Sequence, residues 1–262
     1  MKRTASFLLI TLCIGIIHAQ SYSDAFDQAF RIDDIAGQRQ ALDLWQQSAP
    51  EDVNLFIARY NFYANRAMGE TPAETVPQLA DSALRAITDG IRVFPDRLDL
   101  RFGKIYFLGQ IADWDAFVAE IDSTLNHSMR IAHKWTFPNV PEDMIEGLIV
   151  EGMADYMVEM FVRIADTAHL TDADKVMAKR IQRVAKRTVQ LFPGDFPSTY
   201  MLALSHLMLN EYDKAYKYLM RAERIDNNSI PMLKSLVQVC RALGKDVQAS
   251  EYQQRINYLQ GE

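Results

Sequence analysis

Residues 197–228, PSTYMLALSHLMLNEYDKAYKYLMRAERIDNN, align with residues 231–262, PMLKSLVQVCRALGKDVQASEYQQRINYLQGE, when the chain is shifted by 34 positions. Two unrelated amphipathic helices often share apolar positions, but they seldom share a proline, a turn residue, an alanine and a tyrosine as well. The shift therefore indicates a true repeat. The matched pairs are Pro197 with Pro231, Leu202 with Leu236, Leu209 with Leu243, Asn210 with Gly244, Ala215 with Ala249, Tyr218 with Tyr252, Arg221 with Arg255 and Ile225 with Leu259.

Each repeat reads as two helices joined by a short turn. Asn210 and Gly244 stand where a left-handed residue ends the first helix. Ala215 and Ala249 are small enough to let two helices approach closely. A unit of this kind buries only part of its apolar surface by itself, so the units must stack.

The rest of the chain is helical in pattern but irregular in period. Apolar residues recur at spacings of three and four, and clean strand alternation is absent. Helix starts are predicted at Thr71, followed by Pro72 and Glu74, and more weakly at Thr171, followed by Asp174. Helix ends are predicted before the prolines at 50, 95 and 193.

The 34-residue unit resembles the tetratricopeptide repeat, whose pattern is W-x2-L-G-x2-Y, then A-x3-F, then P. The resemblance implies an all-α fold: a right-handed superhelix (α-solenoid) of about five to six stacked antiparallel helix pairs. We expect a single repeat domain over 20–262, with irregular repeats in 20–195 and clearer ones in 196–262. In the first clear unit the pattern falls on Thr199, Leu202, Ala203, His206, Ala215, Leu219 and Asn227, of which Leu202 and Ala215 match.

Residues 1–19 resemble a secretory signal peptide, with basic Lys2 and Arg3, an apolar run over 7–17 and cleavage near Ala19. An uncleaved amphipathic anchor is the alternative. We therefore expect an exported protein, periplasmic or secreted. No later apolar run is long enough to cross a bilayer, so no membrane insertion of the mature chain is expected. Cys240 would remain as its single cysteine and could form no internal disulfide.

Charge and motifs exclude several classes of function. The formal net charge of −6 gives nucleic acid no attraction. The sequence contains no Gly-rich phosphate loop, GxSxG elbow, CxxC pair or zinc spacing. We therefore predict no catalytic residue, no metal and no cofactor. Cys240 is interpreted as a core thiol and His206 as a packing residue.

One helix, which begins near Pro141, carries Glu151, Asp155 and Glu159 at four-residue spacing. Such carboxylates can bind divalent cations or act as acid and base. The preferred interpretation is a solvated acidic face that lies near a basic ridge on the following helix. That ridge consists of Lys175, Lys179, Arg183 and Lys186.

Two regions are candidates for binding a partner. The stretch HKWTFPNVP offers Trp135 and Phe137 as possible exposed anchors, unless it is a connector whose aromatic rings pack back onto the helices. The tetratricopeptide resemblance places an inner wall on the first helix of each pair. Its members here would be Tyr200, Leu204, Lys234, Gln238 and Arg241. Ser235 and Gln238 replace the asparagines that some repeats use to grip a peptide carboxylate, so that activity is not expected.

These observations favour an exported, non-enzymatic scaffold that binds a protein or peptide through its concave face. One alternative is a structural subunit of a cell-envelope assembly that self-associates through its last helix. The other, which we favour least, is an exported metal-binding or hydrolytic protein that uses carboxylates of 142–159.

Overall fold

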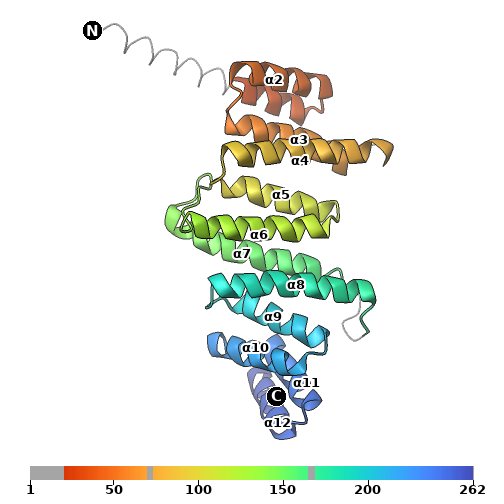
Figure 1. Cartoon of the computed structure of the whole chain (residues 1–262), viewed down its shortest axis with the longest axis vertical. Coiled ribbons are helices and arrows are strands. Elements are labelled where there is room, and N and C mark those ends of the chain that lie inside the picture. Colours follow the sequence, from red (N-terminus) through yellow and green to blue (C-terminus); the bar gives the residue numbers. More distant parts are fainter. Residues whose placement is uncertain (1–20, 70–72, 165–168, 262) are drawn as a thin grey trace, which may run out of the picture. The chain divides into compact units, whose positions relative to one another are not determined.

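The computed structural model describes residues 21–69, 73–164 and 169–261, and they form a succession of helices (Figure 1). The only β-structure in these ranges is an isolated bridge between Arg97 and Thr136. The all-α class expected from the sequence is confirmed. The helices are 21–31, α2 (Ile35–Ser48), α3 (Val53–Met68), the 3-10 turn η1 (Ala73–Thr75), α4 (Val76–Val93), α5 (Leu98–Gln110), α6 (Trp114–Arg130), α7 (Glu142–Phe161), α8 (Asp172–Leu191), α9 (Phe196–Met208), α10 (Tyr212–Ile225), α11 (Ile230–Ala242) and α12 (Asp246–Gln260).

The chain divides into two compact units. The first ends at Phe117 and also contains Trp135–Pro138, while the second consists of Val118–Lys134 and Asn139–Glu262. The single domain expected over 20–262 stays a prediction. The predicted signal peptide lies outside the described residues. Among the described helices, none is both long and apolar enough to span a bilayer.

The predicted left-handed turn residues are confirmed. Asn210 has a φ of 59° and Gly244 a φ of 68°. In both turns the amide of the following residue donates to the carbonyl five residues earlier. Glu211 N–H donates to the His206 carbonyl at 2.9 Å, and Lys245 N–H donates to the Cys240 carbonyl at 2.8 Å. This is the Schellman pattern, which satisfies carbonyl groups left over at the end of a helix.

The same turn recurs in the irregular first unit. Asp33 and Ala112 have φ values of 55° and 58°. The amides that follow them, those of Asp34 and Asp113, donate to carbonyls five residues back at 2.8 and 3.0 Å. Helix pairs of the first unit are therefore joined by the same kind of turn as the C-terminal pairs, although their sequences lack the 34-residue period.

Other helix boundaries follow local chemistry. The box predicted at Thr171 is confirmed, because its hydroxyl accepts from the Asp174 N–H and the Asp174 carboxylate accepts from the Thr171 N–H. The helix ends predicted before the prolines are also confirmed, since α2, α4 and α8 end at residues 48, 93 and 191. Thr71 and Pro72 lie outside the described residues, and α4 begins only at Val76.

The two C-terminal pairs, α9–α10 and α11–α12, share one core in which Ala215, Leu219 and Leu236 are completely buried. Arg221 and Arg255, which match in the repeat, make matching bonds. Arg221 donates to the Pro193 carbonyl at 2.9 Å, and Arg255 donates to the Asn227 carbonyl, 34 residues further on. The tetratricopeptide-like organisation of this region is thus present in its contacts as well as its sequence.

The first unit contains the aromatic connector. Trp135 is 2% exposed, and the Arg101 guanidinium lies over its ring at 5.4 Å. Main-chain bonds hold the connector to α5: Leu98 N–H donates to the Thr136 carbonyl at 3.0 Å. The Phe137 ring meets Phe102 edge to face at 6.5 Å. The suggestion that Trp135 is an exposed anchor is not met, and the alternative of a connector packed back onto the helices agrees with this arrangement.

Candidate binding site on the last two repeats

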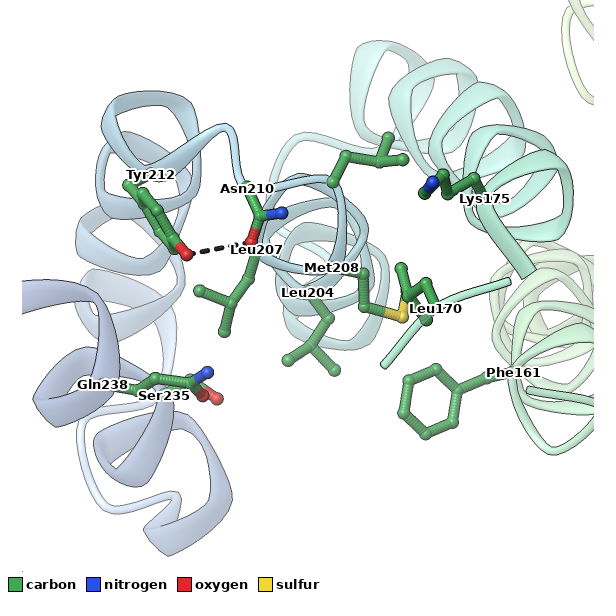
Figure 2. Close-up of a pocket in the computed structure, with 11 residues that line it drawn as sticks. Phe161, Leu170, Lys175, Leu204, Leu207, Met208, Asn210, Tyr212, Ser235 and Gln238 are labelled. Carbon is green, nitrogen blue, oxygen red and sulfur yellow. Dashed lines mark hydrogen bonds between the residues drawn. The ribbon is translucent and has the colours of Figure 1, made fainter. Parts of the chain in front are cut away.

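A cavity of about 430 Å³ lies in the second unit beside the first helices of the two C-terminal pairs (Figure 2). Its lining mixes aliphatic and hydrogen-bonding side chains, and among the described residues Lys175 is the single charged member of the lining. The contributing residues are Phe161 of α7, Leu170, Lys175 of α8, Leu204, Leu207 and Met208 of α9, Leu209 and Asn210 of the turn, Tyr212 of α10, and Ser235 and Gln238 of α11.

Helix α9 provides the apolar wall of the cavity. Its sequence, FPSTYMLALSHLM, contains no charged residue, and Asp195 caps its start by accepting from the Ser198 N–H at 2.8 Å. Leu204, Leu207 and Met208 lie three and four residues apart, which puts them on one face of the helix. Figure 2 shows Leu204 and Met208 directed toward the same space as Phe161.

The polar side of the cavity is held in place by internal hydrogen bonds. The hydroxyl groups of Tyr200 and Ser235 lie 3.1 Å apart and join α9 to α11. The Tyr212 hydroxyl donates to Asn210 Oδ1 at 2.8 Å. Burial raises the pKa of the Tyr200 phenol, so it stays protonated and serves as a hydrogen-bonding group.

The structure brings together part of the predicted wall. Leu204 and Gln238 line the cavity, and Tyr200 bonds to Ser235, which also lines it. Lys234 and Arg241 are exposed on α11 and do not line it. Trp135 and Phe137 belong to the other unit.

Several lining residues were not predicted. Leu207 and Met208 could have been found by extending the three- and four-residue spacing from Leu204. Asn210 and Tyr212 follow from the turn that the repeat defines. Phe161 comes from the preceding helix pair, whose spacing to α9 is not 34 residues, so the sequence period gives no register for it.

A partly buried polar cluster lies at the end of α9. The His206 ring stacks on Tyr218 at 5.4 Å, and its Nδ1 lies 2.5 Å from Glu211 Oε2. Gln182 Nε2 lies 3.0 Å from the same Nδ1 and 3.4 Å from Glu211 Oε2. We assign the Nδ1 proton to the bond with Glu211, because a carboxylate is the stronger acceptor, and Gln182 then donates to that carboxylate. The hydrogen bond from His206, with a second from Lys214, lowers the pKa of Glu211.

The next features to consider are the single thiol of the described residues and the side chains that could bind a metal ion. Cys240 is fully buried in the C-terminal core, and burial raises the pKa of its thiol. In the part of the chain that the structure describes, no three His, Cys, Asp or Glu side chains gather as metal ligands would.

The acidic and basic ridges were expected to lie near each other, and among the described residues no ion pair joins them. Arg183 instead forms an ion pair with Asp122 of α6 at 2.5 Å, and Arg187 donates to Asn126 of the same helix. Within the described ranges, Glu151 and Asp155 form no ion pair.

Comparison with known proteins gives helical-repeat structures and no family. No protein-family model and no curated protein matches the chain. Similar solved structures include "MamA 41-end from Desulfovibrio magneticus RS-1", at 14% identity over 77% of this chain and 95% of that chain, with a TM-score of 0.43. PilW, described as a type IV pilus biogenesis factor, is 14% identical over 92% of both chains, with a TM-score of 0.43. The P58(IPK) TPR domain is 15% identical over 87% of this chain and 66% of that chain, with a TM-score of 0.34. At these values the likenesses carry no argument about function, which rests on the site itself.

Proposed function

We propose that this protein is an exported, non-enzymatic scaffold that binds a protein or peptide through the face formed by α9 and α11. The supporting observation is the cavity between them, where an aliphatic wall from α9 meets the hydrogen-bonding side chains of Ser235 and Gln238. An apolar side chain of a bound segment would fill the wall, and its backbone amide would bond to Gln238. Export is proposed from the apolar run after Lys2 and Arg3.

A charge placed in the cavity should abolish binding by this face. We would immobilise the protein, capture binders from the envelope fraction of its native cell and repeat the capture with Leu204→Arg. The matched control is Val247→Arg on α12, where the replaced side chain is 71% exposed. The proposal expects a partner that is retained by the control and lost with Leu204→Arg. Equal capture by both variants would contradict it.

The second candidate function is a structural subunit that self-associates through its last helix. Val247 and Tyr258 support it, because they are 71% and 82% exposed on α12. Sedimentation of the protein over a range of concentrations tests this candidate. Association that Tyr258→Lys removes would favour it over the peptide-binding scaffold, whereas a constant sedimentation coefficient would exclude it.

A further inference from the structure

A second groove of about 890 Å³ runs between α7 and the loop that joins α8 to α9, and it shares no residue with the α9–α11 cavity. Its apolar lining comes from Val150 and Ala154 on α7 and from Leu191, Phe192 and Pro193 opposite. This space belongs to the second unit alone. A groove with an apolar lining is suited to hold side chains of an extended segment.

Among the residues that the structure describes, every charged side chain lining this groove is acidic. Asp143, Glu146 and Glu151 come from α7, and Asp195 from the start of α9. Asp143 lies in the first turn of α7, where the helix dipole favours a carboxylate, and Asp195 caps α9. Neither explanation covers Glu146 and Glu151, which lie deeper in the helix. In the described part of the chain neither of them has an ion-pair partner.

Glu146 and Glu151 lie on the two sides of the apolar stripe. At 3.6 residues per turn, their five-residue separation places them about 140° apart around the axis of α7. Gly147, Val150 and Ala154 occupy the angles between them. An occupant lying on this stripe would therefore meet a carboxylate on each side.

Two glycines line the groove where neither side-chain packing nor backbone conformation requires glycine. A Cβ added at Gly147 or at Gly194 would meet no atom within 4 Å. Neither glycine has the positive φ found at Gly244. Glycine inside a helix is less stable than alanine, so Gly147 weakens α7 without filling the space beside it.

We propose that the α7 groove binds a basic linear segment of a partner protein. An apolar side chain of the segment lies against Val150 and Leu191, and lysine or arginine side chains on either side of it pair with Glu146 and Glu151. The charge of the groove selects this occupant, since four carboxylates and no basic side chain are found among the described residues of its lining. This site and its partner chemistry are independent of the α9–α11 site.

The test uses fluorescence anisotropy at low salt with three dye-labelled peptides and the purified protein. The first peptide has one leucine between two pairs of lysines, the second replaces the lysines with glutamates, and the third replaces the leucine with glycine. We expect the first to bind, the second not to bind and the third to bind several-fold more weakly. No binding of the first peptide, or equal binding of the first two, would overturn the proposal.

Variants locate the binding. Glu146→Gln with Glu151→Gln should weaken the first peptide about tenfold, because two charge pairs at a partly exposed site are removed. Asp155→Asn is the matched control, since Asp155 is exposed on the same helix but does not line the groove. Circular dichroism confirms that each variant is folded. A loss caused equally by the control would overturn the assignment.

A second copy of the chain is the other occupant that the experiment can detect. Lys179 and Lys186 are exposed on α8 and could supply the positive charge. Sedimentation at rising concentration tests this. Association removed both by the Glu146→Gln, Glu151→Gln protein and by Lys179→Gln with Lys186→Gln would assign the groove to self-assembly and overturn the peptide proposal. A protein that stays at one size supports it.

Discussion

Adding one methyl group at two glycines should change stability in opposite directions. A Cβ at Gly147 or at Gly244 meets no atom within 4 Å, so packing is not altered at either site. Only the backbone differs: Gly147 lies within α7, while Gly244 has a φ of 68° in the turn between α11 and α12. The pair therefore isolates backbone conformation from side-chain contacts.

The magnitudes follow from that difference. At Gly147, alanine should stabilise the protein by about 0.5–1 kcal/mol, because it has the higher helix propensity. At Gly244, a left-handed alanine costs roughly 1–2 kcal/mol. The smaller entropy of the unfolded chain returns about 0.4–1 kcal/mol of this. Gly244→Ala should thus destabilise the protein by about 1 kcal/mol.

Urea denaturation followed by circular dichroism measures both changes. Because an array of repeats need not unfold in one step, native-state hydrogen exchange at the Lys245 amide provides a local reading. This amide donates to the Cys240 carbonyl across the turn at 2.8 Å, and its protection should fall in Gly244→Ala. Ala112→Gly, in the equivalent turn of the first unit, should be slightly stabilising. The reasoning is refuted if Gly147→Ala and Gly244→Ala shift stability in the same direction.

Further predictions concern the core, the thiol and the polar cluster. Leu236→Ala removes a completely buried side chain and should cost about 2–5 kcal/mol in urea denaturation; a cost below about 1 kcal/mol would contradict the core packing. Cys240 should react with a thiol reagent only after unfolding, because it is buried and its pKa is raised; rapid labelling of the native protein would disagree. Glu211→Gln should lower the melting temperature at neutral pH. The lowered pKa of Glu211 means that its contribution is complete above 4.5, the ordinary value, and is lost as the pH falls through the lowered one. The difference in melting temperature between Glu211→Gln and the unmodified protein should therefore shrink on acidification. A difference that grows as the pH falls would contradict the prediction.

The sequence predicted the helix pairs where residue type and conformation agree. Asn210 and Gly244 favour the left-handed conformation by their chemistry, so both turns could be located. Ala112 has no such preference, yet it adopts the same φ because the surrounding helices require it. This is why the repeat was clear after residue 196 and irregular before it.

Burial that depends on distant contacts was not predictable. Trp135 is flanked by Lys134 and Thr136, a pattern typical of an exposed loop, but Arg101 covers it. For the same reason, only some of the residues that line the cavity were predicted from the sequence. Leu204 and Gln238 follow from the 34-residue register, whereas Phe161 and Lys175 reach the cavity through packing of an earlier pair. The α7 groove was missed because its acidic residues were grouped by four-residue spacing, which joins Glu151 to Asp155 and overlooks Glu146.

The interleaving of the two units has a consequence for the order of folding during synthesis. The first unit needs Trp135–Pro138 to complete its core, yet Val118–Lys134, which leave the ribosome earlier, belong to the second. An N-terminal domain usually folds once its last residue has emerged. Here the core of the first unit stays incomplete until Trp135 has emerged, although Val118–Lys134 of the second unit have emerged by then. A pause after residue 117 has emerged from the ribosome, but before residue 138 has, would therefore hold the first unit in an incomplete state, whereas a pause after residue 138 has emerged would not.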